Sequence, residues 1–508
     1  MGNLNNLYNF KNPIRHFFNL DKMKFENLEN LKFKDLGWTE PIKFNIFKTE
    51  NSQRTLSFPN ILNFYILLEK LKTLPNFKNI PNMSSKKRVT PDLELGEFAI
   101  LSYDEAMQRD FFNLTKYDKL LMLDIKSFYG RIYTHDLDVI NVMGDNMDSR
   151  LASLNRGKTN GLLLGSYVSL FLAETFLLDI ENELDEELRK EDINCQYEYF
   201  SDDFYFFCNN KDIEAIKKIF IKVLNTHDME LNDSKTAILD FEEYSKNNNL
   251  EKLWKKIIKV SIDKDEENRK SKKTNKNHPA FFTQLVYRLS QIKEFKYKRV
   301  FLTNFFRTSY FNDLIPSQYT LSDNDFNYIC YIYKVAPESI IYSLTKILKM
   351  DGFNKRKFKE FVKERFNSSL CMGLHDEQIY FYYAIHQLQF TELLTEFKQK
   401  ILDSKNQILI SYLLVDKIIT KEEYQKFLIT PKESDWLQNY HYVLTYDKSN
   451  IDILIPSNIK ESQKSSYVNF YKSNIDAGIP IVKPIKKAQE KITSYVQEKL
   501  DKYVENDE

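Results

Sequence analysis

The stretch that decides the fold is Tyr199-Phe200-Ser201-Asp202-Asp203-Phe204-Tyr205-Phe206-Phe207, in which two adjacent carboxylates separate two aromatic runs. Aromatic residues favour strands, and a short polar break between two strand-like runs is typical of a tight hairpin. Two like charges side by side are unfavourable unless a cation or a proton neutralises them. The pattern therefore predicts a hairpin that could bind a divalent metal ion. A solvated polar turn is the alternative, because Asp is common in turns.

Other segments on both sides of this hairpin carry candidate partners for it. Upstream, an apolar run ends at Asp124, which predicts a carboxylate at the end of a buried strand. A turn with two glycines, residues 161–166, then leads into the apolar segment 167–178, which predicts a buried helix. Downstream of the hairpin, Lys235 offers a positive charge. Strands and helices in this order predict an α+β domain with an antiparallel hairpin.

The order of these segments resembles the palm domain of reverse transcriptases. Four motifs of that domain find a match: Asp124 with Phe128 and Tyr129, the turn 161–166, the segment 200–203, and Lys235 with Thr236. The stretch 124–135 is similar to the form that the first motif takes in the abortive-infection (Abi) polymerases, the AbiK-like bacterial antiphage proteins.

The resemblance implies both an architecture and an activity. Abi polymerases join reverse-transcriptase-like fingers and palm to a large α-helical part that replaces the polymerase thumb. For this chain the resemblance implies a nucleotidyltransferase, namely a template-independent, protein-primed DNA polymerase that acts in abortive-infection antiviral defence. Its substrates would be dNTPs, and its product would be single-stranded DNA attached covalently to the protein. The resemblance also implies a homo-oligomer.

Two other functions stay open at this point. An RNA-templated reverse transcriptase would carry the same carboxylates, and a polymerase fold that has lost its activity could serve as a phage-sensing scaffold. Leu163 and Leu164 stand where templated reverse transcriptases usually carry Pro-Gln, and Leu has no hydrogen-bonding side chain. This departure disfavours templated copying, while the retained Asp124, Asp202 and Asp203 disfavour an inactive scaffold.

The chemistry of nucleotidyl transfer assigns roles to the carboxylates. In this in-line displacement at phosphorus, two divalent ions can stabilise the attacking and leaving oxygens. Mg²⁺ prefers oxygen ligands, so we expect two Mg²⁺ ions, with Mn²⁺ as an alternative. The expected metal positions are Asp124, Ile125 and Asp202. Asp203 is expected to have a supporting catalytic part, because neighbouring strand residues point to opposite faces.

The resemblance also implies nucleotide-binding residues. Tyr129, next to Phe128, would pack under the sugar and exclude a 2′-hydroxyl, and a core tyrosine is the alternative. Lys235 would approach the triphosphate. The compact basic cluster Lys86-Lys87-Arg88 could hold a triphosphate through charge-assisted hydrogen bonds. For these cations, ordinary solvated surface charge is the alternative.

A polymerase needs a hydroxyl group to extend, and protein priming uses a side-chain hydroxyl. Among the 31 tyrosines, Tyr8 is the only one before Tyr65, and it lies in a polar terminal stretch that we expect to be mobile. A mobile tail could carry a growing DNA end into an active site. Tyr8 is therefore the candidate priming nucleophile, and a tail tyrosine that docks on the protein surface is the alternative.

Composition limits the class of protein. The chain has 508 residues, of which 42% are hydrophobic and 14% aromatic, which argues against global disorder. The net charge of +1 argues against broad nonspecific binding of nucleic acid. The four cysteines lack metal-ligand spacing and suggest no disulfide framework, so we expect a reduced, cytoplasmic protein. No signal peptide is recognisable, and the apolar segment 161–173 is too short to span a membrane.

Three parts follow from the pattern along the chain. Residues 1–262 are expected to form the reverse-transcriptase-like fingers and palm. Residues 263–278, an acidic run followed by a basic one, are expected to form a linker or exposed loop. Residues 279–508 are expected to form an all-α, HEAT-like helical-repeat domain. Its last segment, 485–503, has apolar residues at helical spacing and could either associate with a second copy or dock on its own domain.

Overall fold

The computed structural model describes residues 3–26, 28, 36–78, 80–139, 147–246, 281–307, 320–428 and 433–504. The expected linker, residues 263–278, lies outside these ranges. None of the helices in the described ranges combines the length and the hydrophobicity that crossing a bilayer requires.

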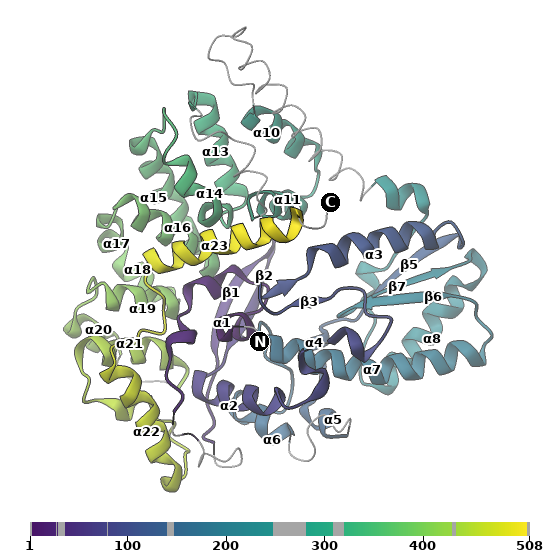
Figure 1. Ribbon diagram of the computed structural model, residues 1–508, viewed down its shortest axis with the longest axis horizontal. Coiled ribbons are helices and arrows are strands. Elements are labelled where there is room, and N and C mark those ends of the chain that lie inside the picture. Colours follow the sequence, from purple (N-terminus) through teal and green to yellow (C-terminus); the bar gives the residue numbers. More distant parts are fainter. Residues whose placement is uncertain are drawn as a thin grey trace.

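A four-stranded antiparallel sheet lies at the right of the view, beside α3, α7 and α8 (Figure 1). Its order is β6 (Gln196–Phe200), β7 (Asp203–Cys208), β5 (Lys119–Asp124) and β8 (Ala237–Leu239). The predicted hairpin is confirmed, since β6 and β7 pair directly and only two residues, Ser201 and Asp202, connect them. The predicted strand that ends at Asp124 is β5, the neighbour of β7.

Helices cover both faces of this sheet (Figure 1). On one face, the rings of Phe204 and Phe206 pack against Phe220 of α8 (Ile213–Thr226), with ring centroids 4.9 and 5.8 Å apart. The long helix α7 (Tyr167–Lys190) lies on the same face. On the other face, α3 (Ile100–Asn113) packs on a smaller cluster that includes Leu120 and Phe207. Successive side chains of each strand point alternately into these two cores, so the residues on both faces of the sheet are apolar.

Shorter elements surround the sheet. They are α1 (Leu4–Tyr8), β1 (Ile42–Thr49), β2 (Ser52–Phe58), α2 (Ile61–Leu71), β3 (Pro91–Asp92), β4 (Glu97–Phe98), α4 (Phe128–Arg131), α5 (Thr134–Val139) and α6 (Met147–Ala152). β1 and β2 form a separate antiparallel hairpin, and so do β3 and β4. Helix α2 begins after Asn60, whose side chain accepts a hydrogen bond from the backbone nitrogen of Leu62 at 3.1 Å.

The C-terminal half is helical, as expected, and no strand occurs among the residues described after 280. Its helices are α10 (Phe281–Gln291), α11 (Phe295–Arg307), α13 (Asp323–Val335), α14 (Ser339–Ile347), α15 (Lys355–Met372), α16 (His375–Leu388), α17 (Glu392–Glu396), α18 (Lys398–Asp403), α19 (Gln407–Val415), α20 (Lys421–Phe427), α21 (Trp436–Tyr446), α22 (Glu461–Asp476) and α23 (Ile485–Val504). Whether they follow a HEAT-like repeat stays a prediction.

The two halves share one hydrophobic core, which does not divide at residue 262. The N-terminal segment runs against the C-terminal helices (Figure 1). The backbone nitrogen of Asn19 donates to the carbonyl of Ile481 at 2.7 Å, and that of Lys483 donates to Phe17 at 2.7 Å. The first residues of the chain therefore contribute to both halves and hold them together.

Helix α23 docks on its own chain. The apolar residues that the sequence places on one face, including Ile485, Ala488 and Ile492, are at most 3% exposed. Of the two alternatives for this segment, the structure thus favours intramolecular docking, because a face already buried cannot pair with a second copy. The homo-oligomer implied by the resemblance stays a prediction.

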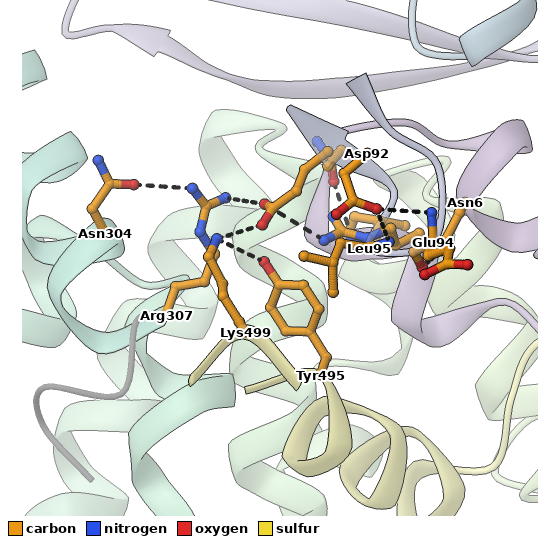
Figure 2. Close-up of polar contacts among 12 residues, drawn as sticks. Asn6, Asp92, Glu94, Leu95, Asn304, Arg307, Tyr495 and Lys499 are labelled. Atoms are coloured by element: carbon orange, nitrogen blue, oxygen red, sulfur yellow. Dashed lines mark hydrogen bonds and ion pairs between the residues drawn. The ribbon is translucent and has the colours of Figure 1, made fainter. Parts of the chain in front are cut away.

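A buried ionic cluster links α23 to the N-terminal half (Figure 2). Glu97 of β4 accepts a hydrogen bond from Lys499 of α23, and its carboxylate lies 3.3 Å from the guanidinium of Arg307 on α11. Arg15, which is 1% exposed, approaches the same carboxylate at 3.9 Å. Burial raises the pKa of Glu97, but the three cations outweigh burial and hold the pKa at about 2. One carboxylate therefore compensates positive charge from three parts of the chain.

We expect Glu97→Gln to lower the free energy of unfolding by about 3–5 kcal/mol, because the substitution leaves buried cations without their counter-charge. Thermal unfolding followed by circular dichroism measures the effect. Glu69→Gln is the control, since Glu69 pairs with Lys72 on the surface of α2 and should change stability by less than about 1 kcal/mol. Equal effects of the two substitutions would contradict the stabilising role of Glu97.

Candidate active site

Three carboxylates meet where β5 and β7 end. Asp124 and Asp203 are directly opposite each other in the antiparallel register, so their side chains leave the same face of the sheet. Asp202 lies in the connecting turn, and its carbonyl accepts a hydrogen bond from the backbone nitrogen of Ile125 at 2.9 Å. Asp124 is 3% exposed. The structure thus brings together the three acidic residues and Ile125 that the sequence singled out.

Two serines next to these carboxylates have a left-handed backbone. Ser201 and Ser127 both have φ of 54°, a conformation that costs energy for residues other than glycine and persists only where the surroundings enforce it. Ser201 directly precedes Asp202, and its hydroxyl lies 3.4 Å from the hydroxyl of Tyr129. The strained turn therefore ties the carboxylate hairpin to the tyrosine of the first motif.

Lys235 and Asn232 hold the carboxylate of Asp124. The amine of Lys235 donates to Oδ2, and the side-chain amide of Asn232 donates to Oδ1 at 2.7 Å. The backbone nitrogen of Asn232 also donates to the carbonyl of Asp124 at 2.8 Å. Sequence reasoning identified Lys235 but missed Asn232. Its place three residues before the lysine, in a polar segment, was the only available signal.

The carboxylates repel one another. Burial raises the pKa of Asp202, and the charge of Asp124 adds to the increase. Burial also raises the pKa of Asp203, which reaches about 7 because both neighbouring carboxylates raise it further. Lys235 supplies one positive charge against these three negative ones. An additional cation would relieve the repulsion, which fits the oxygen donors that Mg²⁺ prefers.

The side chains do not form a closed metal cage as they stand. Within the described ranges, no group of three or more His, Cys, Asp or Glu side chains is arranged to hold a metal ion. A direct cause is visible at Asp124, whose two oxygens face Asn232 and Lys235. A metal ion that uses Asp124 must displace the amine of Lys235, which is half exposed and can turn away.

Phe128 and Tyr129 have different surroundings. Phe128 is 2% exposed, and its ring lies 6.2 Å from that of Phe176 on α7, so the expectation that it contacts a nucleotide is wrong. It belongs to the core because α4 turns it toward α7. Tyr129 is half-buried, packs on Phe128 with ring centroids 5.5 Å apart, and remains next to the carboxylates.

The glycine turn, residues 161–166, is held between α4 and the N-terminal segments. The backbone nitrogen of Leu162 donates to the carbonyl of Tyr129, and that of Ser57 donates to Leu164, both at 2.8 Å. Gly161 has φ of 85°, and a Cβ there would lie 3.3 Å from the carbonyl oxygen of Gly130. Ser166 then caps α7 by accepting from the backbone nitrogen of Ser169 at 3.1 Å. The turn thus fixes Tyr129 relative to the helix.

The basic cluster 86–88 does not face the carboxylate site. Its backbone pairs with the outer edge of β6, where the nitrogen of Arg88 donates to the carbonyl of Tyr199 at 2.9 Å. Each of its three cations forms an ion pair within the chain: Lys86 with Asp185, Lys87 with Glu174, and Arg88 with Asp110. The expected triphosphate site at Lys86, Lys87 and Arg88 is therefore wrong, because these charges already bind carboxylates of α7 and α3.

Tyr8 is not in a mobile tail. It ends α1, is 1% exposed, and its hydroxyl donates to the carbonyl of Pro59 at 2.6 Å. Its ring packs at 4.9 Å from the ring of Phe64. Burial raises the pKa of its phenol well above the usual value. The expectation of a mobile terminal stretch is wrong, because apolar neighbours such as Leu7 fix this helix in the core.

Comparisons with known proteins add little. No model of a protein family matches the chain, and no curated protein matches it. Among solved structures, apo telomerase from Candida tropicalis is 14% identical with a TM-score of 0.30, over 77% of this chain and 69% of the telomerase chain. Telomerase from Candida albicans, in complex with a fragment of telomeric RNA, is 12% identical with a TM-score of 0.30, over 79% and 65% of the two chains. A TM-score of this size does not show a shared fold.

We expect Mg²⁺ to raise the melting temperature of the chelator-treated protein, because a ligand at 100 times its dissociation constant adds about 2.7 kcal/mol of stability. Asp124→Asn should remove most of the increase, as measured by differential scanning fluorimetry. Asp192→Asn is the control, since Asp192 is an exposed turn residue outside the site. If Asp124→Asn left the increase intact, the metal would bind elsewhere.

Proposed function

We propose that this chain is a template-independent, protein-primed DNA polymerase that acts in abortive-infection antiviral defence. The observation that carries the proposal is the register of β5 and β7, which sets Asp124 opposite Asp203 with Asp202 in the turn between them. A partly buried group of like charges is costly for a fold, so its presence needs a reason. Cation-assisted transfer of a nucleotide supplies that reason.

Two Mg²⁺ ions, or Mn²⁺ in their place, would be held by Asp124, Asp202 and Ile125. The backbone nitrogen of Ile125 donates to the carbonyl of Asp202. When bound, these ions would stabilise the attacking and leaving oxygens of the transfer. Asp203 supports the pair from the opposite strand. Lys235, once released from Asp124, presents its amine to the phosphate oxygens of a dNTP. Because Lys235 ends a short 3-10 helix just before β8 and its side chain is half exposed, a turn of the side chain suffices for this exchange.

The sugar of the nucleotide would lie against Tyr129. Contacts with Ser201 and Phe128 support its ring on two sides. A ring fixed in this way leaves little room for a 2′-hydroxyl, which supports deoxynucleotides as substrates. Leu163 and Leu164 pack toward the core and offer only backbone groups, which supports synthesis without a template.

The decisive experiment incubates the purified protein with Mg²⁺ and dNTPs in the absence of any template, and follows DNA attached to the protein on a denaturing gel. We expect Asp202→Asn to lower synthesis at least about 100-fold, since even residues that only support metal ligands cost 10–100-fold when changed. Asp192→Asn, the exposed control, should retain synthesis.

Two outcomes would favour the alternatives. Synthesis that requires an added RNA template would show a templated reverse transcriptase. Protection against phage that survives Asp202→Asn, with no DNA made by either form, would show a scaffold or sensor.

Tyr8 stays our proposed priming nucleophile. It precedes Lys11 by three residues, and the amine of Lys11 lies 5.7 Å from the ring of Phe200 beside the carboxylate turn. In priming, the phenolic oxygen of Tyr8 would bond to the α-phosphorus of a dNTP, pyrophosphate would leave, and the phenolic proton would pass to water. Because the hydroxyl is buried against Pro59, α1 must open before this step.

We expect Tyr8→Phe to abolish the nucleotide–protein adduct while folding is retained. Tyr167→Phe is a matched control, because the buried hydroxyl of Tyr167 also donates to one backbone carbonyl, that of Phe77, at 2.6 Å. Both substitutions remove one comparable hydrogen bond, so only a priming role distinguishes them. Mass spectrometry of the intact protein and of its peptides measures the adduct. An adduct on another residue in Tyr8→Phe would exclude Tyr8.

A further inference from the structure

Three aromatic rings form a platform beside the carboxylate turn. They are Phe98 of β4, Phe200 at the end of β6 and Tyr103 of α3, with centroids 4.8 Å apart for Phe98 and Phe200, 6.0 Å for Tyr103 and Phe200, and 6.4 Å for Phe98 and Tyr103. Phe98 is 9% exposed, whereas Tyr103 is 40% exposed. Because Phe200 is followed by Ser201 and Asp202, the platform borders the site of the proposed chemistry.

A lysine lies over this platform. The amine of Lys11 is 5.3 Å from the ring centroid of Phe98 and 5.7 Å from that of Phe200. Its backbone nitrogen donates to the carbonyl of Gly96 at 2.7 Å, and the nitrogen of Phe10 donates to Gly165 at 2.8 Å. These bonds hold Lys11 at φ of 66°, a left-handed conformation that is strained for a lysine. The fold therefore keeps the backbone of Lys11 in a conformation that costs conformational free energy.

The amine of Lys11 has no acidic partner among the described residues, since none of the ion pairs formed there includes it. Partial desolvation by the surrounding rings lowers the pKa of the Lys11 amine to about 8; the charges of Arg307 and Arg54 add to the decrease, and those of Glu97 and Asp203 oppose it. The amine is thus largely charged at neutral pH. Because Lys11 is exposed, its charged amine can contact an anionic ligand.

An exposed aromatic ring beside a cation is the arrangement that binds single-stranded nucleic acid, because bases stack on the ring and the cation contacts the phosphate. We propose that Tyr103 and Lys11 bind one nucleotide of the nascent single-stranded DNA, with its base on Tyr103 and its phosphodiester next to Lys11. This inference rests on the proposed function and adds to it the place where the product lies. A local site of this kind also agrees with the net charge of +1.

The residues of the proposed site lie where elements from distant parts of the chain meet. The first turn of α3, the β3–β4 hairpin and the C-terminal end of α23 converge beside the four-stranded sheet (Figure 1). The cluster around Glu97, with Arg307 and Lys499, borders the same hairpin (Figure 2).

The test measures binding of a fluorescein-labelled deoxythymidine oligonucleotide to the full chain by fluorescence anisotropy. All proteins carry Asp202→Asn, so that no attached product occupies the site. We expect Tyr103→Ala to weaken binding about tenfold, and Tyr103→Phe, which keeps the stacking surface, to bind normally. Lys11→Gln should weaken binding and reduce the slope of log affinity against log salt by about 0.7, the value for one phosphate contact on a single strand.

The controls are Tyr287→Ala, an exposed helical tyrosine, and Lys116→Gln, which removes an amine 4.0 Å from the ring centroid of Phe112. Both should leave binding unchanged, and circular dichroism confirms folding of every variant. Weakening by Tyr103→Phe equal to that by Tyr103→Ala would overturn the stacking contact. An unchanged salt slope in Lys11→Gln would overturn the phosphate contact, and no binding by the parent protein would overturn both.

A second readout uses the protein with Asp202 intact. Tyr103→Ala and Lys11→Gln should attach the first nucleotide at the normal rate and make shorter DNA, because the nascent strand is held less well. A raised KM for dNTP with normal product length would overturn the proposal in favour of a triphosphate contact. The binding test does not depend on catalysis, so a protein that binds the oligonucleotide but makes no DNA would refute the proposed function alone.

Discussion

The antiparallel pairing of β5 with β7 sets Asp124 against Asp203, and the repulsion between these carboxylates constrains the residues around them. Lys235 and Asn232 both donate to Asp124, and the strained turn at Ser201 keeps Asp202 beside it. The raised pKa of Asp203 records the charge that this pairing leaves uncompensated. A site of this kind is stable only in a rigid frame, which the two cores on either side of the sheet supply.

A second group of charged residues joins the helical half to the N-terminal half. Glu97 meets Arg15, Arg307 and Lys499, which come from the beginning, the middle and the end of the chain. Burial makes each of these ions costly alone, so they stabilise the fold only as a group. Because Phe98 follows Glu97 and contacts Phe200, the same hairpin that anchors α23 also supports the carboxylate turn. The helical half is therefore positioned to affect the site through direct packing.

Much of the site could be predicted from the sequence, because its motifs are local. The hairpin, the strand that ends at Asp124 and the proximity of Lys235 follow from aromatic runs, an apolar run and a family pattern. Other expectations were wrong for one common reason, namely that exposure depends on residues far away in the chain. Lys86, Lys87 and Arg88 form a basic run, yet α7 and α3 bring carboxylates to all three. Tyr8 precedes polar residues, yet Pro59 and Phe64 enclose it.

The sequence by itself indicated the β6–β7 hairpin, the strand that ends at Asp124 and the helical C-terminal half, since side-chain alternation and periodicity act over a few residues. It also indicated the acidic residues of the candidate site, because two like charges side by side are unfavourable unless a cation or a proton neutralises them. Only the tertiary structure decided which cations are free of an ion pair, because the carboxylate that pairs with a cation can come from a distant part of the chain. In the folded chain, carboxylates of α7 and α3 form ion pairs with residues 86–88, whereas Lys11 lies over the rings of Phe98 and Phe200. No local sequence pattern predicts this difference.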